Sequence, residues 1–265
     1  MSDTPGAPAP SNTEPHVALF VTCLADLFRP AVGFASLELL EKAGYDVSVP
    51  VAQTCCGQPA YNSGDYKAAR SLAMQVIDLL EPADYVVVPS GSCAGMLSHH
   101  YPRLLEGDWH DRALALAAKT FELTTFLHEI ARLSAAQRGR SSPGDAAIAY
   151  HDSCAGLREL DIRDQPRTLL HAMCNIQPLE LPQRDVCCGF GGTFCAKMPG
   201  ISAKMADDKL DQAVATGADT LVGGDLGCLL HLAGRAKRRG LNLKLRHVAE
   251  ILVQDSTSPA IGEKS

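Results

Sequence analysis

The sequence lacks the features that mark membrane, secreted and nucleic-acid-binding proteins. No apolar run approaches the roughly 20 residues that a membrane-spanning helix needs. Residues 1–15 contain neither Lys nor Arg and have no apolar core, so they lack the pattern of a secretory signal. The net charge of −6 argues against nucleic acid as a partner, because phosphate recognition needs a basic face. We therefore expect a cytoplasmic protein with disordered tails at 1–15 and 256–265.

The glycine fingerprint of a dinucleotide site is also missing. Gly189, Gly191 and Gly192 lie close together, but the fingerprint requires a strand before it, a helix after it and a different spacing. We find no pattern that indicates a nucleotide or a flavin.

Cysteine, by contrast, is abundant, with 10 residues in the chain. In a reducing compartment cysteines are more often metal ligands or redox groups than structural disulfides. Two adjacent pairs stand before a glycine, as Cys55-Cys56-Gly57 and as Cys187-Cys188-Gly189. Neighbouring side chains on a strand point to opposite faces, so two such sulfurs serve one centre only where the backbone turns. Glycine takes positive φ cheaply and permits that turn. We interpret both pairs as parts of thiolate-ligated sites.

The apolar runs alternate with helical patterns, which predicts an α/β fold with parallel sheets. Strands are expected at 16–21, 45–49, 85–88, 146–150, 176–181, 220–222 and 241–245. Helices are expected at 27–43, 65–80, 111–120, 123–133, 165–173, 202–215 and 247–253.

The pattern occurs twice, which indicates an internal repeat. The first repeat is expected at 16–136, a linker at 137–145 and the second repeat at 146–255. The first set of cysteines matches the second in order, each pair separated by 131–135 residues: Cys23, Cys55, Cys56 and Cys93 match Cys154, Cys187, Cys188 and Cys228. Two α/β halves related by a pseudo-twofold axis follow from this duplication.

These cysteines follow predicted strands, and in parallel α/β sheets ligands bind beyond the carboxyl ends of the strands. The four cysteines of each half should therefore converge on one site. Single cysteines are often merely buried, but eight in a duplicated order favour the ligand interpretation. Four thiolates suit either tetrahedral zinc or an iron–sulfur cluster, and composition does not decide between them.

The order Cys…Cys-Cys-Gly…Cys, present twice, resembles the cysteine-rich CCG domain found in heterodisulfide reductase and in the iron–sulfur subunit of glycolate oxidase. More narrowly, residues 20–23, 55–64, 89–93 and 187–194 are similar to the LutA/YkgE family of L-lactate utilisation proteins. The likeness runs from about His16 to Val253. It implies two tandem Rossmann-like CCG halves, [4Fe–4S] as the cofactor, and other subunits of a lactate-utilisation complex as partners. Zinc at one of the two sites stays open as an alternative.

One departure from the full motif concerns its last cysteine. The motif ends in Cys-x-x-Cys and binds its cluster with five cysteines, whereas this chain has Met96 and His231 at the last position. Met96 is expected to pack in the core, and His231 is more often a core histidine than a ligand in such an apolar helix. Cys195, seven residues after Cys188, could supply a spare thiolate, but both Cys195 and Cys174 are expected to be small buried residues. His151-Asp152, beside Cys154, could orient a ligand, move a proton or cap the loop.

These observations favour a non-autonomous oxidoreductase subunit. By resemblance, its clusters would pass electrons while a complex oxidises L-lactate to pyruvate. Nothing in the chain alone looks able to take hydride from a 2-hydroxy acid, so partner subunits are needed. Two alternatives stay open: thiol–disulfide chemistry of the heterodisulfide reductase or glycolate oxidase subunit type, and a zinc-stabilised scaffold.

Overall fold

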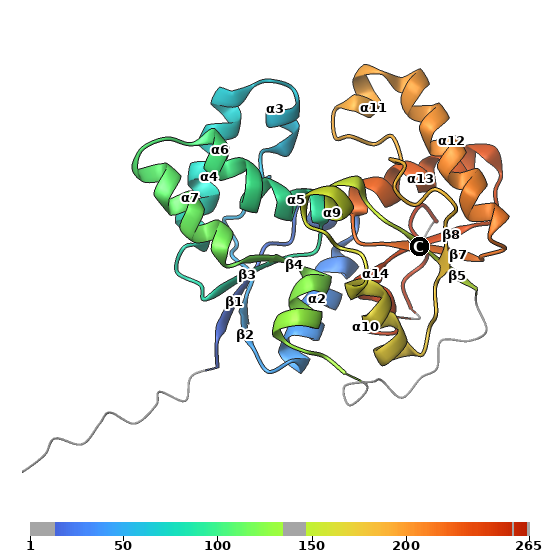
Figure 1. Ribbon diagram of the computed structural model, residues 1–265, viewed down its shortest axis with the longest axis horizontal. Helices are drawn as coiled ribbons and strands as arrows, with labels where there is room; N and C mark the ends of the chain where they lie inside the picture. The colour runs from blue at the N-terminus through green and yellow to red at the C-terminus, as the bar shows by residue number, and fades with distance from the viewer. Residues whose placement is uncertain (1–13, 135–146, 256, 264–265) are drawn as a thin grey trace, which may run out of the picture.

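Two parallel four-stranded sheets, one in each half of the chain, form the framework (Figure 1). The computed structural model describes residues 14–134, 147–255 and 257–263. The first sheet has the order β2 (Asp46–Ser48), β1 (His16–Leu19), β3 (Tyr85–Val88), β4 (Thr120–Glu122). The second has the order β6 (Leu179–Glu180), β5 (Ile148–His151), β7 (Thr220–Gly223), β8 (Lys244–His247). All pairings are parallel, so the duplicated α/β architecture is confirmed.

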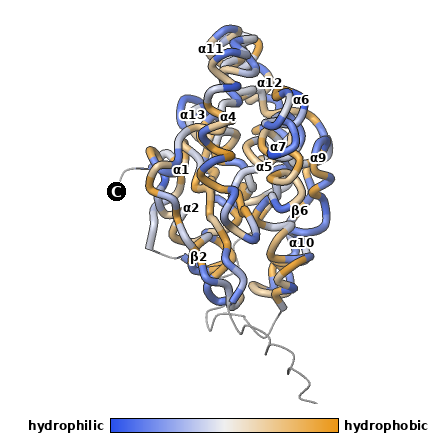
Figure 2. Tube along the Cα trace, turned by 90° about the vertical axis from the view of Figure 1, so that its left-hand side faces the viewer, coloured by the Kyte–Doolittle hydropathy of each residue, from blue (hydrophilic) through white to orange (hydrophobic). Residues whose placement is uncertain are grey.

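Helices connect the strands of each sheet. The first half contains α1 (Cys23–Phe28), α2 (Pro30–Lys42), α3 (Gln58–Asn62), α4 (Tyr66–Leu80), α5 (Gly91–Gly95), η1 (Met96–His100), α6 (Tyr101–Leu104), α7 (Asp108–Ala118), α8 (Leu123–Thr125) and η2 (Phe126–Ile130). The second contains α9 (Cys154–Glu159), α10 (Gln165–Cys174), α11 (Phe194–Lys197), α12 (Pro199–Ala215), α13 (Leu226–Arg239) and α14 (Val248–Leu252). In Figure 2, α11 and β2 lie at opposite ends of the molecule.

The two halves pack against each other through matching pairs of helices. Helix α1 contacts α13, and correspondingly α9 contacts α5, the two labels that meet between the halves in Figure 1. Helix α2 contacts α14, and correspondingly α10 contacts α8 and η2. A buried ion pair of 2.7 Å between Arg29 and Glu250 adds a charged contact across this interface. One apolar cluster accordingly contains residues of both halves, among them Leu39, Phe126 and Leu169.

Local departures from the sequence-based elements have simple causes. The helix expected at 27–43 is divided into α1 and α2 at Arg29, because proline at position 30 disfavours helical backbone at the residue before it. Strand β4 was not expected, since three residues are too few to show an alternating pattern.

The expected linker at 137–145 and most of the expected N-terminal tail lie outside the described residues. Within the expected C-terminal tail, residues 257–263 are described, and Ile261 is buried and donates its N–H to the carbonyl of Leu245. In the described parts of the chain, no helix is both long enough and apolar enough to cross a bilayer.

Candidate metal centres

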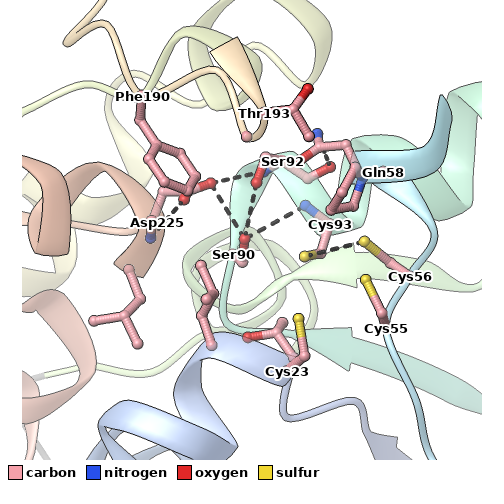
Figure 3. A pocket seen from close by; sticks show the side chains of 16 residues that line it. Cys23, Cys55, Cys56, Gln58, Ser90, Ser92, Cys93, Phe190, Thr193 and Asp225 are labelled. Atoms are coloured by element: carbon pink, nitrogen blue, oxygen red, sulfur yellow. Dashed lines mark hydrogen bonds between the residues drawn. The ribbon is translucent and has the colours of Figure 1, made fainter. Parts of the chain in front are cut away.

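The four cysteines of the first half line one cavity of about 170 Å³. Cys23 begins α1 just after β1, Cys55 and Cys56 follow β2, and Cys93 lies in the first turn of α5 after β3. The loops at the carboxyl ends of neighbouring parallel strands therefore deliver all four sulfurs to one place. The Sγ atoms of Cys56 and Cys93 are 3.4 Å apart, and all four sulfurs lie together in Figure 3.

The second half repeats this arrangement around a cavity of about 200 Å³. Cys154 begins α9 after β5, Cys187 and Cys188 lie between β6 and α11, and Cys228 lies in the first turns of α13 after β7. The Sγ atoms of Cys154 and Cys187 are 3.8 Å apart. None of the 10 cysteines, all within the described residues, forms a disulfide.

Glycine makes each double-cysteine turn possible. Gly57 and Gly189 have φ of +84° and +86°, in the left-handed region that suits glycine. Each donates its backbone N–H to a sulfur 3.4 Å away, Gly57 to Cys55 and Gly189 to Cys187. The turn thus brings two consecutive sulfurs to one cavity and supplies a hydrogen bond to the first of them.

Hydrogen bonds among the thiols concentrate negative charge on one cysteine of each site. The thiols of Cys23 and Cys56 donate to Cys55 and lower the pKa of Cys55 to about 3. At the second site the thiols of the corresponding cysteines hold the pKa of Cys187 well below its usual range. The same cysteine of each site is thus the one whose thiolate form is favoured, and a thiolate is the form of cysteine that binds metals.

The two cavities share part of their walls. Five residues line both of them: Gln58, Ser92, Phe190, Gly192 and Asp225. Phe190 and Asp225 come from the second half yet lie at the first cavity in Figure 3. The sites are consequently neighbours, and neither half by itself encloses its own cavity.

Asp225 is the polar link between the halves at this wall. It is 4% exposed and is the N-cap of α13, where its Oδ1 accepts the N–H of Gly227 at 3.2 Å. Its Oδ2 accepts the N–H of Ser92 at 3.0 Å and the hydroxyl of Ser90 at 3.2 Å. One carboxylate thereby caps a helix in each half, the same two helices that carry Cys93 and Cys228.

Met96 and His231, which stand at the place of the fifth cysteine, make contacts outside the two cysteine cavities. Met96 is fully buried in the apolar core of the first half. His231 forms a hydrogen bond of 3.1 Å with the hydroxyl of Ser202, and its ring packs near Phe190. Neither residue lines a cysteine cavity.

The two remaining cysteines also lie apart from the cavities. Cys174 is buried in the core shared by the halves, and its thiol donates to the carbonyl of Ile251 at 3.3 Å. Cys195 is only half-buried, contrary to the expectation of a buried residue, and its thiol donates to the carbonyl of Gly192 at 3.2 Å.

The sequence left the role of His151 open, and the structure places its side chain beside two cysteines of the second site. A ring nitrogen of His151 and the sulfurs of Cys188 and Cys228 lie within 4.8 Å of one another. Burial, helped by the cation of Lys209, lowers the pKa of His151 to about 3, so the ring is neutral. Helix α9, which follows, is capped by Ser153, whose hydroxyl accepts the N–H of Gly156 at 3.2 Å.

The donor sets fit a thiophilic metal or a cluster. Each cavity brings together four free cysteine sulfurs from three separate loops. Thiolates held this close to one another need a nearby positive charge. Zinc and iron–sulfur clusters are the groups that proteins hold with such sets. The set His151, Cys188 and Cys228 additionally suits zinc, which accepts mixed nitrogen and sulfur ligands.

Comparison with known proteins agrees with the duplicated geometry. The family of the cysteine-rich domain CCG matches twice, at residues 17–98 and 148–233. Lactate utilization protein A 1 of Bacillus cereus (strain AH820) is 47% identical over 238 residues, covering 89% of this chain and 98% of that protein. This chain belongs to the lactate utilization protein A family.

Other relatives support the same placement. Lactate utilization protein A of Bacillus thuringiensis (strain Al Hakam) is 46% identical over the same share of both chains. Among solved structures, a hypothetical protein from Helicobacter pylori has a TM-score of 0.62 at 13% identity. The present chain is covered to 96% but spans only 50% of that protein, so this likeness concerns the fold. The lactate utilization protein A relatives thus match 89% of the chain.

Proposed function

We propose that the chain is an iron–sulfur electron-transfer subunit of a cytoplasmic complex that oxidises L-lactate to pyruvate. The observation that carries the proposal is the pair of adjoining cavities, each lined by four cysteines. The lactate part comes from the relatives, which are named lactate utilization protein A.

The proposed ligands are the four cysteines of each half. In the first half they are Cys23, Cys55, Cys56 and Cys93, and in the second Cys154, Cys187, Cys188 and Cys228. A cluster of the [4Fe–4S] type would supply reversible one-electron storage at a potential set by its surroundings. The chain's own contribution is to hold the sulfurs, to supply N–H donors from Gly57 and Gly189, and to keep the two sites next to each other.

Metal analysis tests the cofactor directly. The chain is purified without oxygen, and iron, acid-labile sulfide and zinc are measured per chain, together with the visible spectrum. We expect several irons with a matching amount of sulfide and a brown protein. A colourless protein that contains only zinc would contradict the iron–sulfur part of the proposal.

Reconstitution with the partner subunits tests the role. We expect no lactate oxidation by the isolated chain with an artificial acceptor, and turnover once the partners are added. Cys55→Ser and Cys187→Ser should each remove most of that turnover, because an incomplete ligand set breaks a site. Fast lactate oxidation by the chain alone would overturn the subunit role, and full turnover of both variants would overturn the ligand assignment.

A second candidate is a scaffold subunit whose second site holds zinc. The buried group of one imidazole and two thiols supports it, because structural zinc sites are often of this composition. In that case the zinc content is one per chain, and removing the metal lowers stability without a redox signal.

A further inference from the structure

The two cysteine sites differ in what lies behind the sulfurs, although the sulfurs themselves match. His151 lies three residues before Cys154, and Phe20 lies three residues before Cys23. The two residues lie at the carboxyl ends of β5 and β1, which hold the same place in the two sheets. His151 is the last residue of β5, and Phe20 extends β1 by donating its N–H to the carbonyl of Val87. At this position the second half therefore has an imidazole where the first half has an apolar ring.

A second difference of the same kind lies on the helix after the double cysteine. The buried positions of α4 and α12 match with a constant separation in the sequence, so Lys209 occupies the position in the second half that Val76 occupies in the first. Lys209 is fully buried and donates its Nζ to the carbonyl of Gln183 at 2.7 Å. Polar groups thus surround the second site at places where the first site has apolar side chains.

The imidazole of His151 is unusual because it has no partner. The residue is 1% exposed, and neither ring nitrogen makes a hydrogen bond. Among the described histidines, only this one has both ring nitrogens buried and unpaired. A buried polar group without a partner is unfavourable, and in a stable fold it calls for a ligand or a bound ion. Nothing in the packing of an apolar core explains a histidine here, since phenylalanine fills the matching place.

We infer that His151 is a nitrogen ligand of the metal centre at the second site, which it binds together with Cys188 and Cys228, whereas the first site is bound by sulfur alone. A ring nitrogen lies within 4.8 Å of both sulfurs, and the cavity offers Cys154 and Cys187 as further donors. His231, the histidine at the place of the missing fifth cysteine, instead forms a hydrogen bond with the hydroxyl of Ser202, so we do not assign it as the ligand.

The consequence is a functional difference between the two sites. A neutral imidazole adds a donor without adding negative charge, and the reduction potential of an iron–sulfur centre depends on its ligand set. The two sites should therefore differ in reduction potential, although their sulfurs match. This inference rests on the proposed metal loading but not on lactate as the substrate.

The test measures coordination rather than activity. The full chain with Cys55→Ser and Cys56→Ser, which disables the first site, is purified without oxygen, and X-ray absorption is recorded at the edge of the metal present, iron or zinc. Pulsed EPR of the reduced iron form, with and without ¹⁵N-labelled histidine, detects a coordinated imidazole. We expect a nitrogen ligand in this background and in a His231→Gln version, and its loss in a His151→Phe version, which copies Phe20.

The outcomes separate this inference from the proposed function. A metal coordinated only by sulfur in the His151-containing chain, or a nitrogen signal that survives His151→Phe, overturns the inference and leaves the iron–sulfur proposal standing. A chain that contains neither iron nor zinc overturns both. The labelling comparison uses the chain that still contains His151. If the His151→Phe chain fails to fold, a result showing only sulfur ligands in the His151-containing chain would still refute the assignment.

Discussion

Replacing Gly189 with alanine should damage the second site far more than replacing Gly57 damages the first. Both glycines make the same turn, with nearly the same φ, and an L-residue held in the left-handed region costs about 1–2 kcal/mol. The surroundings differ. A Cβ on Gly57 would lie 3.4 Å from the Cβ of Leu72, which is an ordinary contact. A Cβ on Gly189 would lie 2.7 Å from the carbonyl oxygen of Ser202 and 2.9 Å from the Cβ of Met205.

The steric clash of an added Cβ adds to the cost of the positive φ only at Gly189. Relieving contacts this short requires α12 to shift, and overpacking of this kind typically costs about 1–3 kcal/mol. We therefore expect Gly189→Ala to lower the free energy of unfolding by about 2–5 kcal/mol and Gly57→Ala by about 1–2 kcal/mol. Gly189→Ala should also lose metal, because the turn that aims Cys187 and Cys188 is displaced.

Urea unfolding of the metal-free chain, followed by circular dichroism, measures these differences. Gly217→Ala is the matched control, since Gly217 has φ of +77° but nothing within 4 Å of its added Cβ. It should lose only the backbone contribution and keep its full metal content. Equal losses at Gly189 and Gly57 would refute the reasoning from the contacts with Ser202.

Three further predictions concern the ligands, the interface and pH. Cys188→Ser should lower metal content and melting temperature while Cys174→Ser, remote from both cavities, changes metal content little; equal metal in both variants would contradict the assignment. Asp225→Ala should cost about 2–4 kcal/mol in urea unfolding, because it removes a buried carboxylate that accepts N–H groups in both halves; a loss below about 1 kcal/mol would argue against this link. Burial raises the pKa of Glu122 to about 7, above its unfolded value, so stability should fall by up to about 3 kcal/mol as pH rises from 4.5 to 8. Glu122→Gln should flatten that decline between pH 5 and 8, and unchanged pH profiles in the two proteins would show that Glu122 does not cause it.

The duplicated cysteine spacing contained enough information to group the site residues. Nearly equal separations placed each cysteine after an equivalent strand, and the carboxyl ends of parallel strands lie at one edge of the sheet, so the two sets of four could be assigned without coordinates. The turns at Gly57 and Gly189 were predictable for the same local reason, because only glycine takes that backbone cheaply.

What the sequence did not reveal depends on contacts between the halves. Phe190 and Asp225 line the cavity of the other half, and no periodicity within one repeat indicates which surface faces the second repeat. His151 carried a weak signal, a histidine three residues before a cysteine at the end of a strand. Its significance became visible only when burial and two unpaired nitrogens were known. Strand β4 was not predicted for a simpler reason, since three residues are too few to show an alternating pattern.

The common wall of the two cavities makes their occupancies thermodynamically linked. A group bound in one cavity would lie against the Gln58 and Phe190 side chains that also line the other cavity, so it changes the wall that a second group meets. Such coupling is reciprocal: the factor by which a loaded first site changes the affinity of the second equals the factor in the opposite direction. The metal affinity of one site should therefore differ between chains in which the other site is filled and chains in which it is empty.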